Sequence, residues 1–327
     1  MRILHTLHWV QFAGTERFCV DICNELSKNN EVYLLTHNLI KPYINNKVNL
    51  LEINFEKNRY NPIFLYKIAN IIKKVNPDVI HVHNTKELEV MYNARIFLNK
   101  KIPILATKHT LTPKKKFVLA DLAVGILEET HSIINADNTL IIKNGMAYKE
   151  PKPVKKEDKF HIVSAARLTP AKGMDLIIKA LGLVKFDYKF SIFGEGEQKE
   201  ELIQLIKQLG LEDRIKIVGF VDNLNDHLAS ADVQIIASVF EPYGLTAIDG
   251  IYYSDVLLST NTGICSEILD KDLIFDQKPE ALASKLEDLF VNYEYYLELF
   301  KKVKNRKDDF SISKMTSEYI KAYESLL

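Results

Sequence analysis

Apolar and polar positions alternate along the chain in two different periods. Short, mostly apolar segments are typical of strands buried on both faces of a sheet; in the first half they are residues 3–7, 31–36, 78–82 and 102–107. Between them, residues 16–30 and 64–75 have helical spacing, with Phe18, Ile22 and Leu26 on one face of the first segment. This alternation predicts a parallel sheet covered by helices on both sides.

The alternation stops at residues 149–159, where prolines and charges without an apolar period predict an exposed linker. It then restarts, with predicted strands at 160–166, 189–193, 215–218 and 233–237 and predicted helices at 173–183, 199–209 and 224–229. We therefore predict an α/β protein with two Rossmann-like, doubly wound domains at residues 1–148 and 160–310. Residues 311–327 are predicted to form a final amphipathic helix, which carries Met315, Tyr319 and Tyr323 at four-residue spacing.

Composition adds few constraints of its own. A length of 327 residues suits two domains, and 43 basic residues against 43 acidic ones give no reason to expect a nucleic-acid partner. Cys19, Cys23 and Cys265 have no disulfide or zinc spacing, so we expect buried thiols in a reducing compartment. No uncharged apolar run approaches the roughly 18 residues of a spanning helix. We expect a soluble cytoplasmic protein, which leaves room for a contact with a membrane surface.

Two strand-to-helix turns in the second half are candidates for ligand binding. Arg167 and Lys172 follow the first strand of that half, at the edge where doubly wound sheets bind ligands. Two cations beside a helix N-terminus suit a diphosphate, and would stabilise the charge that grows on it as a leaving group; the alternative is a solvated basic loop. The turn with Gly194 and Gly196 resembles half of a dinucleotide fingerprint, although Lys199 stands where the third glycine would fall, and a tight turn also explains it.

Two acids flank a third turn, between a strand and a helix. Glu241 and Asp249 lie on either side of Gly244. A carboxylate accepts hydrogen bonds from neighbouring hydroxyls, which makes it a natural ligand for a sugar or a ribose. Asp249 alone is explained as well by a solvated helix residue.

Histidines follow strands in the first half. His109 comes just after a strand, where it would orient a hydroxyl or stabilise charge, or else be a hydrogen-bonded structural residue. His81 and His83 share one face of a strand, but no third metal ligand is evident nearby in the sequence. We therefore predict no metal site.

Taken together, these segments resemble the retaining glycosyltransferases of family 4. That family has the GT-B fold, in which two Rossmann-like domains face each other across a cleft. The resemblance is strongest over residues 160–267, where the cationic pair, the glycine turn, residues 219–221 and the acid pair follow the family's order. In the first half, the turn at residues 13–17, the strand with the two histidines and residues 143–146 also match.

The resemblance implies a donor site and a set of catalytic groups. The donor-binding residues would be Gly14, Arg167, Lys172, Gly194, Gly196, Phe220, Val221, Glu241, Tyr243, Gly244, Leu245, Thr246 and Asp249. The catalytic residues would be His109, Glu241, Arg167 and Lys172. Arg167 and Lys172 would contact the diphosphate, residues 219–221 would line the base, and residues 244–246 would approach the phosphates through their backbone. Glu241 would hold sugar hydroxyls.

The reaction implied by the resemblance needs no cofactor and no divalent metal. A hexose-type sugar would move, with retention of its anomeric configuration, from a UDP-sugar, or less favourably a GDP-sugar, to a glycan or lipid-linked glycan. Synthesis of bacterial lipopolysaccharide, capsule or another surface polysaccharide is the setting that the family suggests. A peripheral contact with the cytoplasmic face of the inner membrane would fit that setting, and residues 114–116, three lysines, suit an anionic surface or a solvated loop.

The chain departs from the family pattern at several positions. Asp249 stands where the family usually has a second glutamate, Ala13 replaces a glycine, and residues 252–258 lack the usual glycine and proline. Two alternatives follow. One is a non-catalytic partner subunit that binds a nucleotide sugar or glycan, and the other is a nucleotide-sugar 2-epimerase, for which the first half offers no fitting pair of carboxylates.

Overall fold

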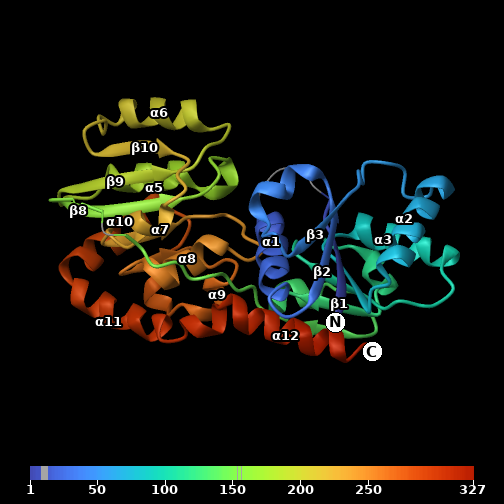
Figure 1. The fold of residues 1–327 in the computed structure, drawn as a ribbon. Coiled ribbons are helices and arrows are strands. Elements are labelled where there is room, and N and C mark those ends of the chain that lie inside the picture. The colour runs from blue at the N-terminus through green and yellow to red at the C-terminus, as the bar shows by residue number, and fades with distance from the viewer. Residues whose placement is uncertain (9–13, 153, 156) are drawn as a thin grey trace. The chain divides into compact units, whose positions relative to one another are not determined.

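Residues 1–8, 14–152, 154–155 and 157–327 are described by a computed structural model (Figure 1). Ala13, which belongs to the first glycine-containing turn, lies outside these residues. Contacts within the chain divide it into two compact units. Unit 1 consists of residues 1–147 and 309–327, and unit 2 of residues 148–308.

Unit 1 is built on a parallel sheet with seven strands among the described residues. In spatial order they are β3 (Val48–Glu52), β2 (Glu31–Thr36), β1 (Arg2–Thr6), β4 (Val79–Val82), β5 (Ile104–Lys108), β6 (Leu122–Gly125) and β7 (Thr139–Ile141). Its helices are α1 (Gly14–Leu26), η1 (Asn38–Tyr43), α2 (Pro62–Val75), α3 (Thr85–Ala94), η2 (Arg95–Phe97), η3 (Lys115–Leu119), α4 (Glu128–Ser132) and α12 (Ile312–Glu324). The order 3-2-1-4-5-6 is that of a doubly wound Rossmann sheet.

Both faces of the unit 1 sheet are buried, as the apolar strands predict. Ile3 packs into one core with residues of α1 and α12, whereas its neighbour Leu4 packs into a second core with residues of α2 and α3. Successive strand residues point to opposite faces, so a strand buried on both sides must be apolar throughout. Burial of one such side chain is worth about 1.5–3 kcal/mol.

The final helix, α12, packs on α1 in unit 1. Ser311 caps it, since its hydroxyl accepts a hydrogen bond from the backbone N–H of Lys314 at 3.2 Å. Met315, Tyr319 and Tyr323 are all buried in the core that also contains α1. Their four-residue spacing therefore reflects one apolar face of the helix, as the sequence predicts.

Unit 2 has a smaller parallel sheet of the same kind. Its described strands, in spatial order, are β10 (Ile215–Gly219), β9 (Tyr188–Phe193), β8 (Phe160–Ala165), β11 (Val233–Ile236) and β12 (Leu257–Ser259). The helices are η4 (Pro170–Lys172), α5 (Met174–Leu181), α6 (Lys199–Gln208), α7 (Leu224–Leu228), α8 (Leu245–Tyr253), α9 (Cys265–Ile268), η5 (Lys271–Leu273), α10 (Pro279–Val291) and α11 (Tyr293–Lys304), followed by η6 (Lys307–Phe310) at the boundary with unit 1. The predicted pair of doubly wound parallel sheets is confirmed.

Two expectations about the segments differ from the structure. α1 ends at Leu26 rather than at residue 30, because the Ser27 hydroxyl donates to the Asn24 carbonyl and the Asn30 amide donates to the Leu26 carbonyl. Such side-chain bonds compete with the helix. Most described residues of the predicted linker are exposed, as expected, but its start is fixed to unit 2, since the Lys149 N–H donates to the Tyr253 hydroxyl at 2.9 Å.

Candidate functional site

The loop after β8 carries Arg167 and Lys172 at the carboxyl edge of the unit 2 sheet. The side chain of Arg167 is exposed, and Lys172 is the last residue of η4. Gly173 follows with φ +64, and a Cβ there would lie 2.2 Å from the carbonyl oxygen of Ala237. Only glycine allows this approach, which brings the β8 loop against the end of β11.

The glycine turn after β9 holds the same loop from its other side. A Cβ on Gly194 would lie 1.9 Å from the Ala166 carbonyl oxygen, and one on Gly196 would lie 2.2 Å from that of Leu168. The Leu168 N–H also donates to the Glu195 carbonyl at 2.9 Å. Both glycines are therefore required by close backbone packing, and their observed effect is to fix the loop that presents Arg167.

Lys172 forms an ion pair with Glu241 across these loops. The pair is shielded from water, because the two side chains are only 23% and 17% exposed. Ser238 Oγ lies 3.3 Å from the same carboxylate oxygen, Oε2, and the Glu241 N–H donates to Thr262 Oγ1 at 2.9 Å. The alternative of a solvated basic loop therefore does not describe Lys172, although the other cation of the loop, Arg167, is exposed.

Glu241 lies next to the start of α8. Gly244, with φ +91, precedes that helix, and no side chain among the described residues caps it. A Cβ on Gly244 would lie 3.1 Å from Cγ of Glu241. The N–H groups of Leu245 and Thr246 thus open α8 beside the ion pair, and uncapped N–H groups at a helix start attract anions.

The remaining predicted donor residues of unit 2 differ in exposure. Asp249, on α8, is only 6% exposed, so the alternative that it is a solvated helix residue is wrong. Tyr243 is buried, whereas Phe220 is 75% exposed directly after Gly219, which has φ +92. Val221 is half-buried.

His109, in unit 1, ends a row of three imidazoles. Its Nε2 lies 3.3 Å from Nδ1 of His83, and Nε2 of His83 lies 3.3 Å from Nδ1 of His5. His109 is half-buried, and burial lowers its pKa to about 3. The ring is therefore neutral at pH 7, and no described residue forms a hydrogen bond with Nδ1. Gly14, the other unit 1 residue of the predicted donor site, is exposed as the first residue of α1.

His81 has partners at both ring nitrogens. Nδ1 lies 2.7 Å from the Tyr323 hydroxyl and Nε2 lies 2.8 Å from Thr107 Oγ1. Burial lowers the pKa of His81 and of His83 well below the usual histidine value. The structure brings a third possible ligand that was not evident nearby in the sequence, because one ring nitrogen each of His5, His81 and His83 lie within 4.8 Å of one another. Since hydroxyls occupy both nitrogens of His81, a hydrogen-bonded core explains the cluster without a metal.

Glu87 is a buried acid that sequence reasoning missed. Its carboxylate accepts hydrogen bonds from the Thr6 hydroxyl at 2.8 Å and from the His83 N–H at 3.0 Å. Burial raises its pKa to about 7, although these hydrogen bonds oppose the shift. A signal was present in the sequence: Asn84 caps α3 and Glu87 stands three residues later, as in a capping box.

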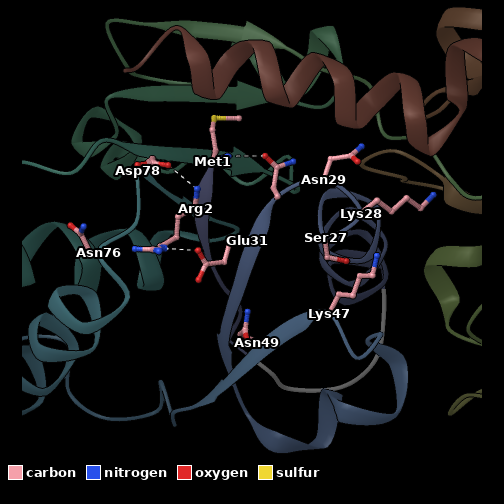
Figure 2. A pocket seen from close by; sticks show the side chains of 11 residues that line it. Met1, Arg2, Ser27, Lys28, Asn29, Glu31, Lys47, Asn49, Asn76 and Asp78 are labelled. Carbon is pink, nitrogen blue, oxygen red and sulfur yellow. Dashed lines mark hydrogen bonds and ion pairs between the residues drawn. The ribbon is translucent and has the colours of Figure 1, made fainter.

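An open pocket of about 910 Å³ lies elsewhere in unit 1, at the amino ends of β1, β2 and β4 (Figure 2). Two of its charged residues already bind Arg2: Arg2 Nε donates to Glu31 at 2.8 Å, and the Arg2 backbone N–H donates to Asp78 at 2.7 Å. Doubly wound sheets bind ligands at the opposite, carboxyl ends of their strands. We therefore assign no site here.

Two family models match the chain. Residues 147–306 match "Glycosyl transferases group 1", and residues 12–135 match "Glycosyltransferase Family 4". Together these ranges cover most of both units. Within the described ranges, each helix is too short or too polar to span a bilayer.

The chain is similar to named glycosyltransferases. It is 37% identical, over 32% of its length, to N-acetylgalactosamine-N,N'-diacetylbacillosaminyl-diphospho-undecaprenol 4-alpha-N-acetylgalactosaminyltransferase of Campylobacter jejuni. That match covers 28% of the relative's length. The chain also spans less than half of the length of two further glycosyltransferase relatives. A second Campylobacter jejuni enzyme, GalNAc-alpha-(1->4)-GalNAc-alpha-(1->3)-diNAcBac-PP-undecaprenol alpha-1,4-N-acetyl-D-galactosaminyltransferase, is 23% identical over 98% of both chains.

A solved structure shares the fold. Anabaena Alr3699/HepE in complex with UDP-glucose aligns with a TM-score of 0.83 and 18% identity, over 99% of each chain. At this identity the likeness concerns the fold alone.

The histidine core predicts a stability that falls in mild acid. In the unfolded chain, protons bind below about pH 6.5 to His81, His83 and His109, whereas in the folded protein these rings stay neutral, so acid favours unfolding. Glu87 has the opposite effect on stability between about pH 4.5 and 7, because its pKa is higher in the folded protein than in the unfolded chain. With three groups against one, we expect a loss of about 2–3 kcal/mol per pH unit between pH 6 and 5. Urea denaturation followed by circular dichroism measures it.

The variant His83→Gln provides the control. It removes one of the three neutral imidazoles, so the pH slope should become shallower by about 1.4 kcal/mol per unit. An unchanged slope would show that His83 is already protonated in the folded protein.

Proposed function

Because the chain belongs to the group 1 and family 4 glycosyltransferases, which have the GT-B fold, we propose that it transfers a hexose-type sugar from a UDP-sugar to a glycan acceptor. The observation that carries this proposal is the shielded ion pair between Lys172 and Glu241, next to the start of α8. A GDP-sugar is the less favoured donor.

The donor's diphosphate would bind where positive groups meet. Arg167 supplies an exposed guanidinium on the same loop as Lys172. Lys172 supplies an ammonium that pairs with Glu241, and Glu241 lies against Gly244 at the start of α8, where the first N–H groups of the helix are uncapped by a side chain of the described residues. When the bond between the anomeric carbon and the phosphate oxygen breaks, negative charge grows on the departing diphosphate. Fixed cations and N–H dipoles stabilise that charge without having to reorganise.

Glu241 would hold the sugar. Among the described residues, the polar contacts of its carboxylate, with Lys172 and Ser238, both use Oε2. Oε1 is thus left to accept hydrogen bonds from sugar hydroxyls. We propose that Asp249, on the same helix, binds the ribose, and that the exposed ring of Phe220 lies against the base.

We further propose that the reaction needs no divalent metal, since Arg167 and Lys172 bring the charge that a metal would otherwise supply. The acceptor oxygen would bond to the anomeric carbon on the face that the diphosphate leaves, which retains the configuration. The acceptor's proton would pass to the diphosphate. His109, which is neutral, would donate a hydrogen bond to the reacting sugar or accept one from it.

The names of the two Campylobacter jejuni relatives support a lipid-linked acceptor, since both contain undecaprenol. We propose that this chain also extends a lipid-linked glycan of a bacterial surface polysaccharide, such as lipopolysaccharide or capsule. It would then act as a peripheral protein at the cytoplasmic face of the membrane.

Variants of the ion pair test the donor site. Lys172→Ala should raise the barrier of transfer by about 2–4 kcal/mol, because charge stabilisation is lost. Glu241→Ala should abolish transfer. Both effects are measured as kcat with the best donor from a panel of UDP- and GDP-sugars, with UDP affinity followed by calorimetry.

Lys179→Ala is the matched control for these variants. Lys179 pairs with Asp175 on the exposed face of α5, so removing it should leave kcat and UDP affinity unchanged. The double variant Lys172→Met/Glu241→Gln removes both charges together, so no shielded charge is left unpaired. A loss of activity in this variant is therefore not caused by the destabilisation that a single unpaired charge would bring. Turnover near the wild-type rate in Lys172→Ala or Glu241→Ala would contradict the assigned roles.

His109 should matter for turnover more than for donor affinity. His109→Ala is expected to lower kcat by about 10²–10⁴-fold, the usual range for a positioned imidazole, with UDP affinity changed little. His37→Ala serves as the control, since it removes an imidazole of unit 1 that is not part of the proposed site. The His37 side chain caps η1, where it accepts a hydrogen bond from the Leu39 N–H at 3.3 Å. An unchanged rate in His109→Ala would leave this residue a purely structural role.

A further inference from the structure

Large apolar side chains gather on the surface of unit 1 around α2, α3 and η2, which lie near one another (Figure 1). Ile63 and Ile96 are each 80% exposed, and Tyr60, Tyr66 and Tyr92 are exposed as well. Exposed apolar residues that occur singly need no explanation, whereas a contiguous group indicates a binding surface.

These side chains come from elements that contact one another in unit 1. Tyr60, Tyr92 and Ile96 line the same open pocket, of about 670 Å³. The ring of Tyr66 packs edge-on against Phe97, with the ring centroids 5.7 Å apart. Ile63 stands one helical turn before Tyr66 on α2. We call Tyr60, Ile63, Tyr66, Tyr92 and Ile96 the aromatic surface.

Cations surround the aromatic surface. The Arg59 guanidinium lies 5.4 Å from the centre of the Tyr60 ring, and that of Arg95 lies 5.6 Å from the Tyr92 ring. Arg59 and Lys116 share the carboxylate of Glu89, so the lysines of residues 114–116 adjoin this surface.

The positive charge is concentrated in this part of the chain. Residues 57–121 contain 13 lysine and arginine residues against 4 aspartate and glutamate residues, although the whole chain carries 43 of each kind. Two of the four acids, Glu89 and Asp121, each pair with two cations. Along the exposed face of α2, the apolar start is followed by Lys67, Lys73 and Lys74.

We propose that the aromatic surface and its cations dock unit 1 on an anionic lipid bilayer. Tyrosine and isoleucine side chains insert among lipid headgroups, while long basic side chains reach the phosphates around them. An anionic surface matches the excess of positive charge, and each lysine or arginine near it strengthens binding by about fivefold. The inference deepens the proposed function, because it rests on a lipid-linked acceptor that this docking would bring within reach.

The test is sedimentation of the full-length protein with vesicles. Vesicles of phosphatidylglycerol and phosphatidylethanolamine should bind the protein, and more strongly at low salt, whereas pure phosphatidylcholine should bind it at least tenfold less. Ile63→Glu/Ile96→Glu should reduce binding at least tenfold. Lys114→Gln/Lys115→Gln should reduce it by about fivefold for each lysine.

Val291→Glu is the matched control, since Val291 is 77% exposed but lies in unit 2 on α10. It should bind vesicles as the wild type does. UDP affinity is measured on every variant. Absent UDP binding would contradict the proposed donor site, whereas absent vesicle binding would contradict the proposed docking surface, so the two failures are distinguishable. Wild-type protein that stays in solution with all vesicles, or unchanged binding in Ile63→Glu/Ile96→Glu, would overturn the inference and leave a protein partner as the occupant of this surface.

Discussion

The ion pair between Lys172 and Glu241 is the interaction around which unit 2 places its functional groups. Two opposite charges with limited exposure stabilise each other only if their backbones are held firmly, because either charge left alone would lack solvation. The glycines supply that firmness. Gly173 lets the β8 loop touch the end of β11, and Gly194 lets the β9 turn touch the β8 loop. The result is a rigid edge at which a carboxylate, an ammonium and a helix start meet.

Unit 1 depends on the opposite arrangement at its histidine cluster, where burial keeps His81, His83 and His109 uncharged. His81 fits between two hydroxyls, one of them from Tyr323 on α12, and burial keeps the ring neutral. The final helix is thereby tied to the central strands by polar as well as apolar contacts. The neighbouring row of His5, His83 and His109 ends at His109, whose Nε2 lies 3.3 Å from Nδ1 of His83.

The sequence indicated the architecture well because its signals are local. Apolar runs and helical spacing gave two doubly wound sheets, and the four-residue spacing in α12 marked a buried face. The strands β3, β6, β7 and β12 were missed. His5 beside His81 and His83 could not be foreseen, because their proximity depends on the pairing of β1 with β4. The pairing of Lys172 with Glu241 was hidden for the same reason, since 69 residues separate them in the chain. The burial of Asp249 depends on how α8 packs, which its own sequence does not reveal.

Whether the donor nucleotide binds at the unit 2 loops around Lys172 and Glu241 is best tested by hydrogen–deuterium exchange with and without UDP, because this measurement locates the nucleotide without relying on any variant. The account predicts slower exchange in three segments of unit 2, residues 166–173, 194–198 and 241–249. Protection limited to unit 1, such as at the amino ends of β1 and β2 around Arg2 and Glu31 (Figure 2), would contradict it.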